Sequence, residues 1–225
     1  MAEPKHTIFA CAGIKPELEH LRGDAEGVKI NYLPQNLHRA PDTLRQTIRE
    51  KLDQVGPEDG SIILGYGLCS NAVTGLKAPV QGLYIPRVHD CISLYMGSSE
   101  SYRERFNKYP GTYYLTRGWI KEEKDPLGLM QNEYTHRVGA DMAEEAIRYE
   151  IRNYDYISYI HTSGDSEDED AYLERAKENA RYFDKTFVEY ETNNDFFNKI
   201  LFGPYDGSDF IYVEPNKTVS QKEFL

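Results

Sequence analysis

The sequence predicts an α/β fold with a mostly parallel sheet and helices on both of its faces. Two observations carry this prediction. Short apolar runs of strand length alternate along the chain with segments of helical periodicity. Several of the runs also end at turn signals such as Gly13 and Pro34. This alternation is typical of βαβ units, and 225 residues with 40% hydrophobic content can bury a substantial core.

The helices are predicted from apolar stripes and the strands from short apolar runs. Pro41, for example, opens a segment in which Leu44, Ile48 and Leu52 share one helical face. We expect strands over residues 7–10, 28–33, 61–64, 83–88, 111–116, 156–160, 187–190 and 210–213. We expect helices over residues 16–21, 41–55, 72–76, 98–106, 138–151, 171–183 and 196–202.

The polar segment over residues 121–125, followed by Pro126 and Gly128, predicts a long connection. It separates an N-terminal lobe over residues 1–120 from a C-terminal lobe over residues 138–225, with a connection or lid over 121–137. Two closely packed Rossmann-like lobes are one interpretation, and a single domain is the other.

Charge and hydropathy exclude two classes of partner. Lys and Arg total 26 against 37 Asp and Glu, a net charge of −11, which disfavours nucleic acid. No apolar stretch is long enough to span a bilayer, so we expect no membrane partner. The first residues lack the pattern of a cleavable signal, and we therefore expect a cytoplasmic protein.

Each of the three cysteines follows a predicted strand. Cys11, Cys69 and Cys91 would therefore lie at the carboxyl ends of parallel strands, where open α/β sheets bind ligands. An odd number of cysteines without a secretion signal argues against a disulfide framework. Any one of them alone can be a small buried hydrophobe, but three equivalent positions favour a shared site.

Thiolates at helix starts would have a lowered pKa, because backbone N–H groups and the helix dipole stabilise the charge. Three thiolates with an open fourth position suit a catalytic zinc ion, and the same trio can hold an iron–sulfur cluster. We therefore predict Cys11, Cys69 and Cys91 as metal ligands. The alternative in which Cys69 is a nucleophile and His89 its base leaves the other two cysteines unexplained.

His89 and Asp90 are the candidate catalytic residues. If the strand expected over residues 83–88 continues to Cys91, the side chains of His89 and Cys91 point to the same side, because residues two apart on a strand share a face. His89 would then transfer protons or serve as a fourth ligand. A structural histidine is the competing interpretation. His161 also follows a predicted strand and ranks below His89.

Four further residues are predicted to contact a cofactor. Three lie in the turn after residues 61–64, namely Gly65, Tyr66 and Gly67, and the fourth is Trp119, after residues 111–116. Backbone amides of Gly65, Tyr66 and Gly67 could bind phosphate, but GxG alone is a weak signal. The favoured interpretation is that the glycines let the backbone turn sharply and bring Cys69 into the crevice. Trp119 can form a wall of the site or pack in a core. The acidic run over residues 165–170 lacks the spacing of a calcium loop and is expected to be a solvated helix start.

Four groups of residues resemble the DUF1638 domain family over most of the chain. They are Ala10-Cys11 with Lys15-Pro16-Glu17-Leu18, Leu64-Gly65-Tyr66-Gly67-Leu68-Cys69, Arg87 with His89-Asp90-Cys91, and Pro110-Gly111-Thr112-Tyr113-Tyr114 through Gly118-Trp119. The family usually has glycine after the second cysteine, where Ser70 and Asn71 stand here. The resemblance implies a metal or thiol site in a protein of anaerobic bacteria and archaea, often beside corrinoid-dependent methyl-transfer systems.

Two functions remain as hypotheses. The first is a metal-dependent enzyme of one-carbon or sulfur metabolism, which transfers a methyl group to or from a small molecule or a corrinoid. The second is a non-catalytic accessory protein that carries a metal, an iron–sulfur cluster or a corrinoid for a methyltransferase. Their partners are a small-molecule substrate in the first case and a corrinoid protein or methyltransferase in the second.

Overall fold

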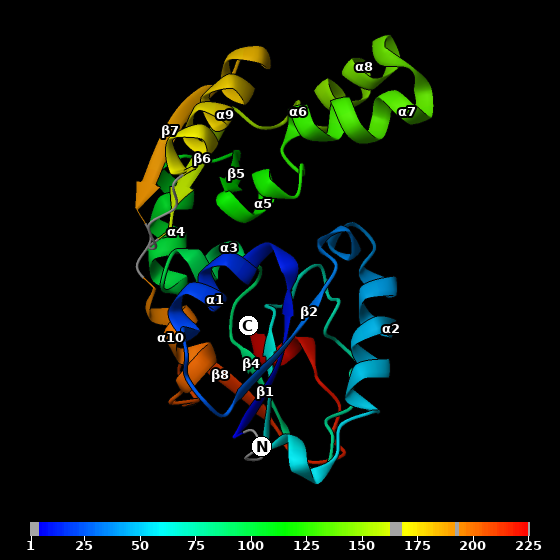
Figure 1. The fold of residues 1–225 in the computed structure, drawn as a ribbon, viewed down its shortest axis with the longest axis vertical. Coiled ribbons are helices and arrows are strands. Elements are labelled where there is room, and N and C mark those ends of the chain that lie inside the picture. Colours follow the sequence, from blue (N-terminus) through cyan, green and yellow to red (C-terminus); the bar gives the residue numbers. More distant parts are fainter. Residues whose placement is uncertain (1–4, 163–167, 192–193, 225) are drawn as a thin grey trace. The chain divides into compact units, whose positions relative to one another are not determined.

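The computed structural model describes residues 5–162, 168–191 and 194–224 and confirms the predicted fold class. Two mostly parallel sheets are flanked by helices (Figure 1). The chain divides into two compact units, of which the first comprises residues 1–97 and 195–225 and the second residues 98–194. Within the described ranges, no helix combines the length and the apolar character needed to cross a bilayer.

The first unit is built on a five-stranded sheet with the order β2-β1-β3-β4-β8. Its strands are β1 (His6–Cys11), β2 (Val28–Leu33), β3 (Ser61–Gly65), β4 (Leu83–Pro86) and β8 (Phe210–Val213). The first four run parallel, and β8 pairs antiparallel with β4. Its helices are α1 (Lys15–Arg22), α2 (Pro41–Leu52), α3 (Ile92–Tyr95) and α10 (Asp195–Phe202). Short 3₁₀ helices lie at Ala12–Ile14, Gln35–Arg39, Pro57–Asp59 and Gln221–Phe224.

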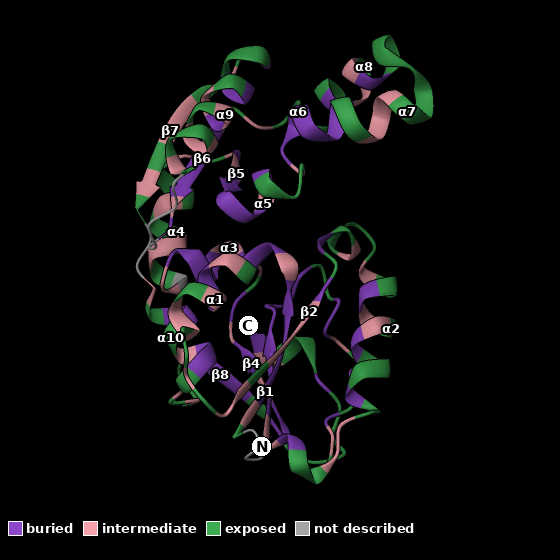
Figure 2. Ribbon diagram, in the orientation of Figure 1, coloured by how far each residue is buried: buried purple, intermediate pink, exposed green. Residues whose placement is uncertain are grey.

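Helix α2 covers one face of this sheet because its apolar stripe is continuous. Leu44, Ile48 and Leu52 are buried and join the core cluster that contains Phe9 and Leu64 of the sheet. Complete burial of such a side chain contributes roughly 1.5–3 kcal/mol. Strands β1 and β4 are mostly buried, whereas the edge strand β2 is mostly half-buried (Figure 2).

The opposite face is covered by α1 and α10 (Figure 1). Ile8 and Ala10 alternate with the residues that face α2 and are fully buried. Phe197 of α10 meets Tyr95 of α3 edge to face, with ring centroids 5.0 Å apart. The sheet of the first unit therefore has helices on both faces, as the sequence predicts.

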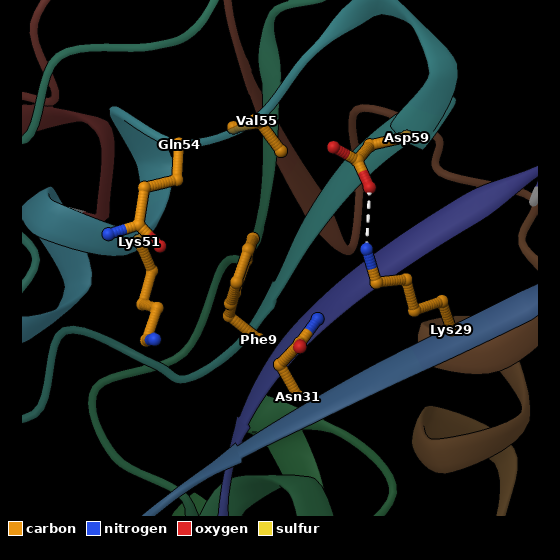
Figure 3. A pocket seen from close by; sticks show the side chains of 7 residues that line it. All are labelled: Phe9, Lys29, Asn31, Lys51, Gln54, Val55 and Asp59. Carbon is orange, nitrogen blue, oxygen red and sulfur yellow. Dashed lines mark hydrogen bonds and ion pairs between the residues drawn. The ribbon is translucent and has the colours of Figure 1, made fainter.

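An ion pair between Lys29 and Asp59 lies toward the amino ends of β2 and β3 (Figure 3). The Asp59 carboxylate accepts hydrogen bonds from Lys29 Nζ at 2.8 Å and from the Gly56 N–H at 3.0 Å. The lysine holds the pKa of Asp59 below its usual range. The adjacent pocket of about 150 Å³ is lined by Phe9, Lys29, Asn31, Lys51, Gln54, Val55 and Asp59.

The second unit contains a three-stranded parallel sheet with the order β5-β6-β7. Its strands are β5 (Thr112–Thr116), β6 (Tyr156–His161) and β7 (Thr186–Glu191). Its helices are α4 (Ser99–Lys108), α5 (Arg117–Lys121), α6 (Pro126–Leu129), α7 (Thr135–Val138), α8 (Ala140–Glu150) and α9 (Glu169–Tyr182), with a π-helical turn at Met130–Tyr134.

Strand pairing divides the chain differently from the lobes expected over residues 1–120 and 138–225. Strand β5, expected in the N-terminal lobe, pairs with β6, whereas β8, expected in the C-terminal lobe, pairs with β4. The period-two pattern identifies a strand but does not identify the neighbour to which it hydrogen bonds. Each expected lobe therefore contains a strand that belongs to the other unit.

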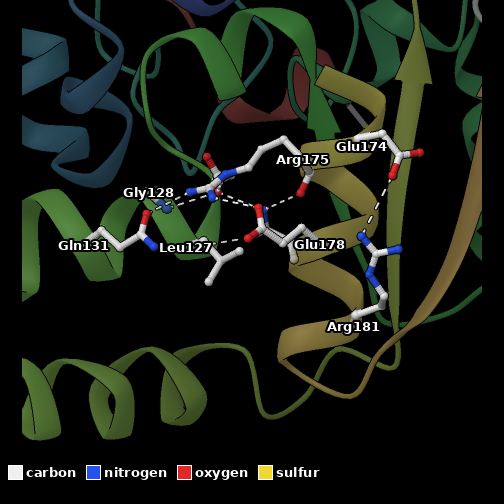
Figure 4. A network of polar contacts seen from close by, with 9 residues as sticks. Leu127, Gly128, Gln131, Glu174, Arg175, Glu178 and Arg181 are labelled. Atoms are coloured by element: carbon white, nitrogen blue, oxygen red, sulfur yellow. Dashed lines mark hydrogen bonds and ion pairs between the residues drawn. The ribbon is translucent and has the colours of Figure 1, made fainter. Parts of the chain in front are cut away.

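The segment expected as a connection or lid over 121–137 is helical from Pro126 onward and anchored to α9 (Figure 4). Asp125 is buried, and its carboxylate accepts hydrogen bonds from the Gly128 N–H, Arg175 Nε and Asn179 Nδ2 at 2.9–3.1 Å. Asn179 Oδ1 in turn accepts from the Leu127 N–H at 2.9 Å. Because these buried polar groups satisfy one another, this part of the segment is integral to the second unit.

Asn179→Ala should lower the free energy of unfolding by about 2–3 kcal/mol, because it removes partners from two buried polar groups, Asp125 and the Leu127 N–H. Urea unfolding followed by the fluorescence of Trp119, the single tryptophan, reports on this unit. Glu178→Ala is the matched control, because the Glu178 side chain, which pairs with Arg175, is 55% exposed, and it should change stability by less than about 0.5 kcal/mol. Equal effects of the two substitutions would contradict the anchoring role.

Candidate functional site

The sheet order of the first unit brings the three cysteines to the carboxyl ends of adjacent strands. Cys11 is the last residue of β1, Cys69 follows β3, and Cys91 follows β4. The chain leaves β1 toward β2 and leaves β3 toward β4, in opposite directions along the sheet. In open α/β sheets this reversal opens a crevice in which ligands bind.

The register of β1 and β3 sets Cys11 beside the turn after β3. Phe9 pairs with Leu64 and Ala10 with Gly65, so Cys11 and Tyr66 are the residues that follow the last paired positions. Cys11, Tyr66 and Cys69 all belong to the core cluster on the α2 side of the sheet. Two of the thiols and the Tyr66 ring therefore share one environment.

Three consecutive residues after β3 have left-handed backbone conformations. Cys69, Ser70 and Asn71 have φ values of 45°, 55° and 65°, and the Ala72 N–H donates to the Cys69 carbonyl at 3.1 Å. Such a conformation costs an L-residue roughly 1–2 kcal/mol. Glycine avoids this steric cost, which explains why a glycine after Cys69 suits this turn. Turns also replace the helix expected over residues 72–76.

Hydrogen bonds to the loop after β4 hold this turn in place. The N–H groups of Leu68 and Cys69 donate to the carbonyls of Val88 and His89, both at 2.9 Å. Gly67 makes this approach possible, because a Cβ atom there would lie 2.7 Å from the Val88 carbonyl oxygen. The loops that carry Cys69 and Cys91 are thus joined through their backbones.

The three thiols are buried, and the pKa values of Cys69 and Cys91 depend on neighbouring thiols. Cys11, Cys69 and Cys91 are 7%, 6% and 5% exposed. Burial raises the pKa of Cys69 to about 12, and the Asp90 carboxylate and Cys11 add to the effect. Burial is the main cause that raises the pKa of Cys91 well above its usual value, and the thiols of Cys69 and Cys11 raise it further.

The expectation that helix starts lower these thiol pKa values is therefore wrong for Cys69 and Cys91. Cys69 lies in a turn, and Cys91 precedes only the four-residue helix α3, so desolvation outweighs the dipole. Both thiols are neutral at neutral pH in the metal-free protein. The raised pKa of Cys69 also argues against its use as an isolated nucleophile.

Thiol donors suit a soft metal ion, but the distances between the three cysteines do not match those of a ligand set. In the described part of the chain, no group of three His, Cys, Asp or Glu side chains lies at the spacing of metal ligands. Ligation would require the thiols to lose their protons and to draw together around the ion.

The expected alternation of His89 and Cys91 is wrong, because β4 ends at Pro86, before it reaches them. His89 is exposed whereas Cys91 is buried, so the two side chains do not share one environment. Asp90 Oδ1 accepts hydrogen bonds from the N–H groups of Ile92 and Ser93 at 3.0 and 3.3 Å. Asp90 thereby caps α3 and helps to position Cys91.

The glycine-rich turn and Trp119 lie in different units. Gly65 is packed so closely that a Cβ atom there would lie 2.8 Å from the Ala10 Cβ. Gly65 and Gly67 are thus required by close packing, and Tyr66 is the residue of this turn with a side chain at the thiols. Trp119 is half-buried on α5 of the second unit.

His161 also belongs to the second unit, where carboxylates surround it. Its Nε2 atom lies 2.9 Å from Glu189 Oε2, and its Nδ1 atom lies 3.5 Å from Glu169 Oε1. The Tyr159 hydroxyl donates to the same Glu169 oxygen at 2.8 Å. Of the acidic run over residues 165–170, residues 165–167 lie outside the described chain, and α9 begins at Glu169 as a helix start.

Sequence reasoning missed the support beneath the turn after β1. The Tyr95 hydroxyl lies 3.0 Å from the Gly13 carbonyl oxygen, to which it donates, and 3.3 Å from Glu17 Oε2. Both side chains are completely buried. A tyrosine inside the apolar run after Cys91 was the available signal, because a buried hydroxyl requires a partner.

A family profile described as "Protein of unknown function (DUF1638)" matches residues 32–201, more than half of the chain. The chain belongs to the DUF1638 family. The matched region of this DUF1638 protein includes Cys69 and Cys91 and begins after Cys11. No curated protein and no solved structure matches the chain.

Gly67→Ala should destabilise the first unit by about 1–3 kcal/mol, because the added methyl group overlaps the Val88 carbonyl and side chain. Gly207→Ala is the matched control in the same unit, since a Cβ atom there meets nothing within 4 Å. Urea unfolding followed by far-UV circular dichroism measures both. A Gly67→Ala protein as stable as the control would contradict the close approach of the two loops.

The metal-free protein should lose stability as the pH rises from about 8.5 toward 10. The unfolded thiols ionise near a pKa of about 8.5, whereas burial keeps folded Cys69 and Cys91 protonated, so the unfolded state releases more protons. Each thiol can contribute up to about 1.4 kcal/mol per pH unit. Urea unfolding across this range should give a shallower loss for Cys69→Ser, and identical slopes would show that Cys69 is not desolvated.

Proposed function

We propose that this DUF1638 protein binds a soft metal ion through the thiolates of Cys11, Cys69 and Cys91. The supporting observation is that all three cysteines of the chain are buried and placed after adjacent parallel strands. Cys11 raises the pKa values of both Cys69 and Cys91, and Cys69 raises that of Cys91, which supports a shared site. Packing alone gives no reason for three cysteines at equivalent strand ends.

Thiolate ligands favour Zn²⁺, and three of them leave a fourth position open for a substrate. An iron–sulfur cluster is the second choice for the same ligands. The high thiol pKa does not oppose binding, because a metal ion replaces the protons and neutralises the buried charge. Free thiols persist in a reducing compartment, so we place the protein in the cytoplasm.

The reaction that we propose is methyl transfer to the sulfur of a small substrate. A zinc ion, when bound, stabilises the thiolate form of a substrate thiol. The thiolate lone pair then forms the sulfur–carbon bond, the bond between the methyl carbon and its donor breaks, and the donor keeps that electron pair. A methylated small molecule or a methyl-corrinoid would serve as the donor.

The chain's own residues have distinct roles in this proposal. Exposed His89 would accept the proton that leaves the substrate thiol and pass it to solvent. Asp90 would position Cys91 by capping α3. Gly67 would allow the loops that carry Cys69 and Cys91 to meet.

Burial of the thiols supports a second candidate. With exposures of only 5–7%, the sulfur atoms have little open surface for a substrate. A non-catalytic accessory protein, which holds a metal or serves a corrinoid protein or methyltransferase, requires no such access. Stoichiometric metal without turnover of methylated compounds would favour this candidate.

Replacement of any one of the cysteines by Ser should reduce bound metal at least tenfold, on the order of the loss expected for a weakened ligand set. Elemental analysis and absorption spectra of anaerobically purified protein measure the metal, and visible absorption separates a cluster from zinc. His89→Ala is the matched control from the same loop and should keep full metal, because its exposed side chain is not a proposed ligand. Circular dichroism verifies the fold of each variant. Full metal content in Cys69→Ser would overturn the proposal.

A further inference from the structure

The hydroxyl group of Tyr66 is buried at the thiol site and has no hydrogen-bond partner among the described residues. The side chain is 3% exposed. Leaving a polar group buried and unsatisfied costs free energy, and native proteins rarely retain such a group without a reason. An acceptor that is not part of the described chain would remove this cost.

Tyr66 lies close enough to the three cysteines for their charges to affect its pKa. Tyr66 follows Gly65, the strand partner of Ala10, whereas Cys11 follows Ala10, and Cys69 lies three residues further along the same turn as Tyr66. Tyr66, Cys11 and Cys69 belong to one core cluster. Leu33, which pairs with Cys11, and Leu68 belong to it too, and the Asp90 carboxylate lies close enough to raise the pKa values of Cys69 and Cys91.

Tyr66 remains a donor under ordinary conditions. Burial raises its pKa, and ionisation of Cys11, Cys69 or Cys91 would raise it further, because the added charges disfavour a phenolate. A protonated phenol donates one hydrogen bond.

Tyr95 provides a comparison within the same unit. It is also completely buried, but its hydroxyl donates to the Gly13 carbonyl at 3.0 Å. Removal of the Tyr95 hydroxyl would therefore break a bond within the protein, whereas removal of the Tyr66 hydroxyl would break none that the described chain makes. A comparison of Tyr66→Phe with Tyr95→Phe therefore distinguishes a role in ligand binding from a structural role.

We infer that the Tyr66 hydroxyl donates a hydrogen bond to the sulfur of a small substrate thiolate at the three-cysteine site. The inference rests on the metal centre proposed above and assigns the ligand to a chemical class. The ligand must bring the acceptor that Tyr66 lacks, it must suit a soft metal ion, and its body must be small enough to fit among buried side chains. A thiolate meets these requirements, and its sulfur is the atom that the proposed methyl transfer would modify.

The test uses the full chain loaded with Co²⁺, whose thiolate complexes absorb light, and 2-mercaptoethanol as the thiol probe. Tyr66→Phe should bind Co²⁺ with unchanged stoichiometry but bind the thiol about 10- to 100-fold more weakly, the loss expected for a hydrogen bond to a charged acceptor. The thioether 2-(methylthio)ethanol is the control ligand, because it cannot become a thiolate. Its affinity should be the same for both proteins.

Melting temperatures of the metal-free proteins give a readout that does not depend on the ligand. Tyr66→Phe should melt at or above the wild-type temperature, whereas Tyr95→Phe should melt lower because it loses a bond to Gly13. Equal thiol affinity in Co²⁺-loaded wild type and Tyr66→Phe would overturn the role of Tyr66 but leave the metal centre standing. A melting loss in Tyr66→Phe as large as that in Tyr95→Phe would overturn it too. Failure of the wild type to bind Co²⁺ would overturn the metal centre, and this role with it.

Discussion

The close approach of the loops after β3 and β4 is the constraint on which the candidate site depends. Two backbone hydrogen bonds, from Leu68 to Val88 and from Cys69 to His89, join the loops. They form only because Gly67 has no side chain to separate the loops. Through this contact, cysteines that are 22 residues apart in sequence, 91 − 69, come into one electrostatic environment.

Several unfavourable features gather where these loops meet. Three consecutive residues from Cys69 to Asn71 have left-handed backbones, the thiols of Cys69 and Cys91 are desolvated, and the Tyr66 hydroxyl lacks a partner in the described chain. Strain and unsatisfied polar groups persist where the surrounding structure holds them and where function requires them. These features lie at the carboxyl ends of the strands, which is also where open α/β sheets bind their ligands.

The secondary structure was largely predictable, whereas the pairing of strands was not. The strands β2 and β8 were predicted with their observed limits, because short apolar runs bounded by turn residues determine strand positions locally. That β8 lies antiparallel to β4, and that β5 pairs with β6, depends on contacts between distant segments. The helix expected over residues 72–76 failed for a related reason, since bonds to a distant loop hold the preceding turn in a left-handed conformation.

The sequence by itself determined the α/β class and the position of each cysteine after a strand, because periodicity and turn residues act over short stretches of chain. It also singled out the glycine-rich turn around Tyr66. Only the tertiary structure decided that His89 is exposed, that Asp90 caps a helix, and that burial raises the pKa of Cys69 instead of lowering it. Burial and hydrogen bonding arise from residues far apart in the chain, and a local pattern carries no information about them.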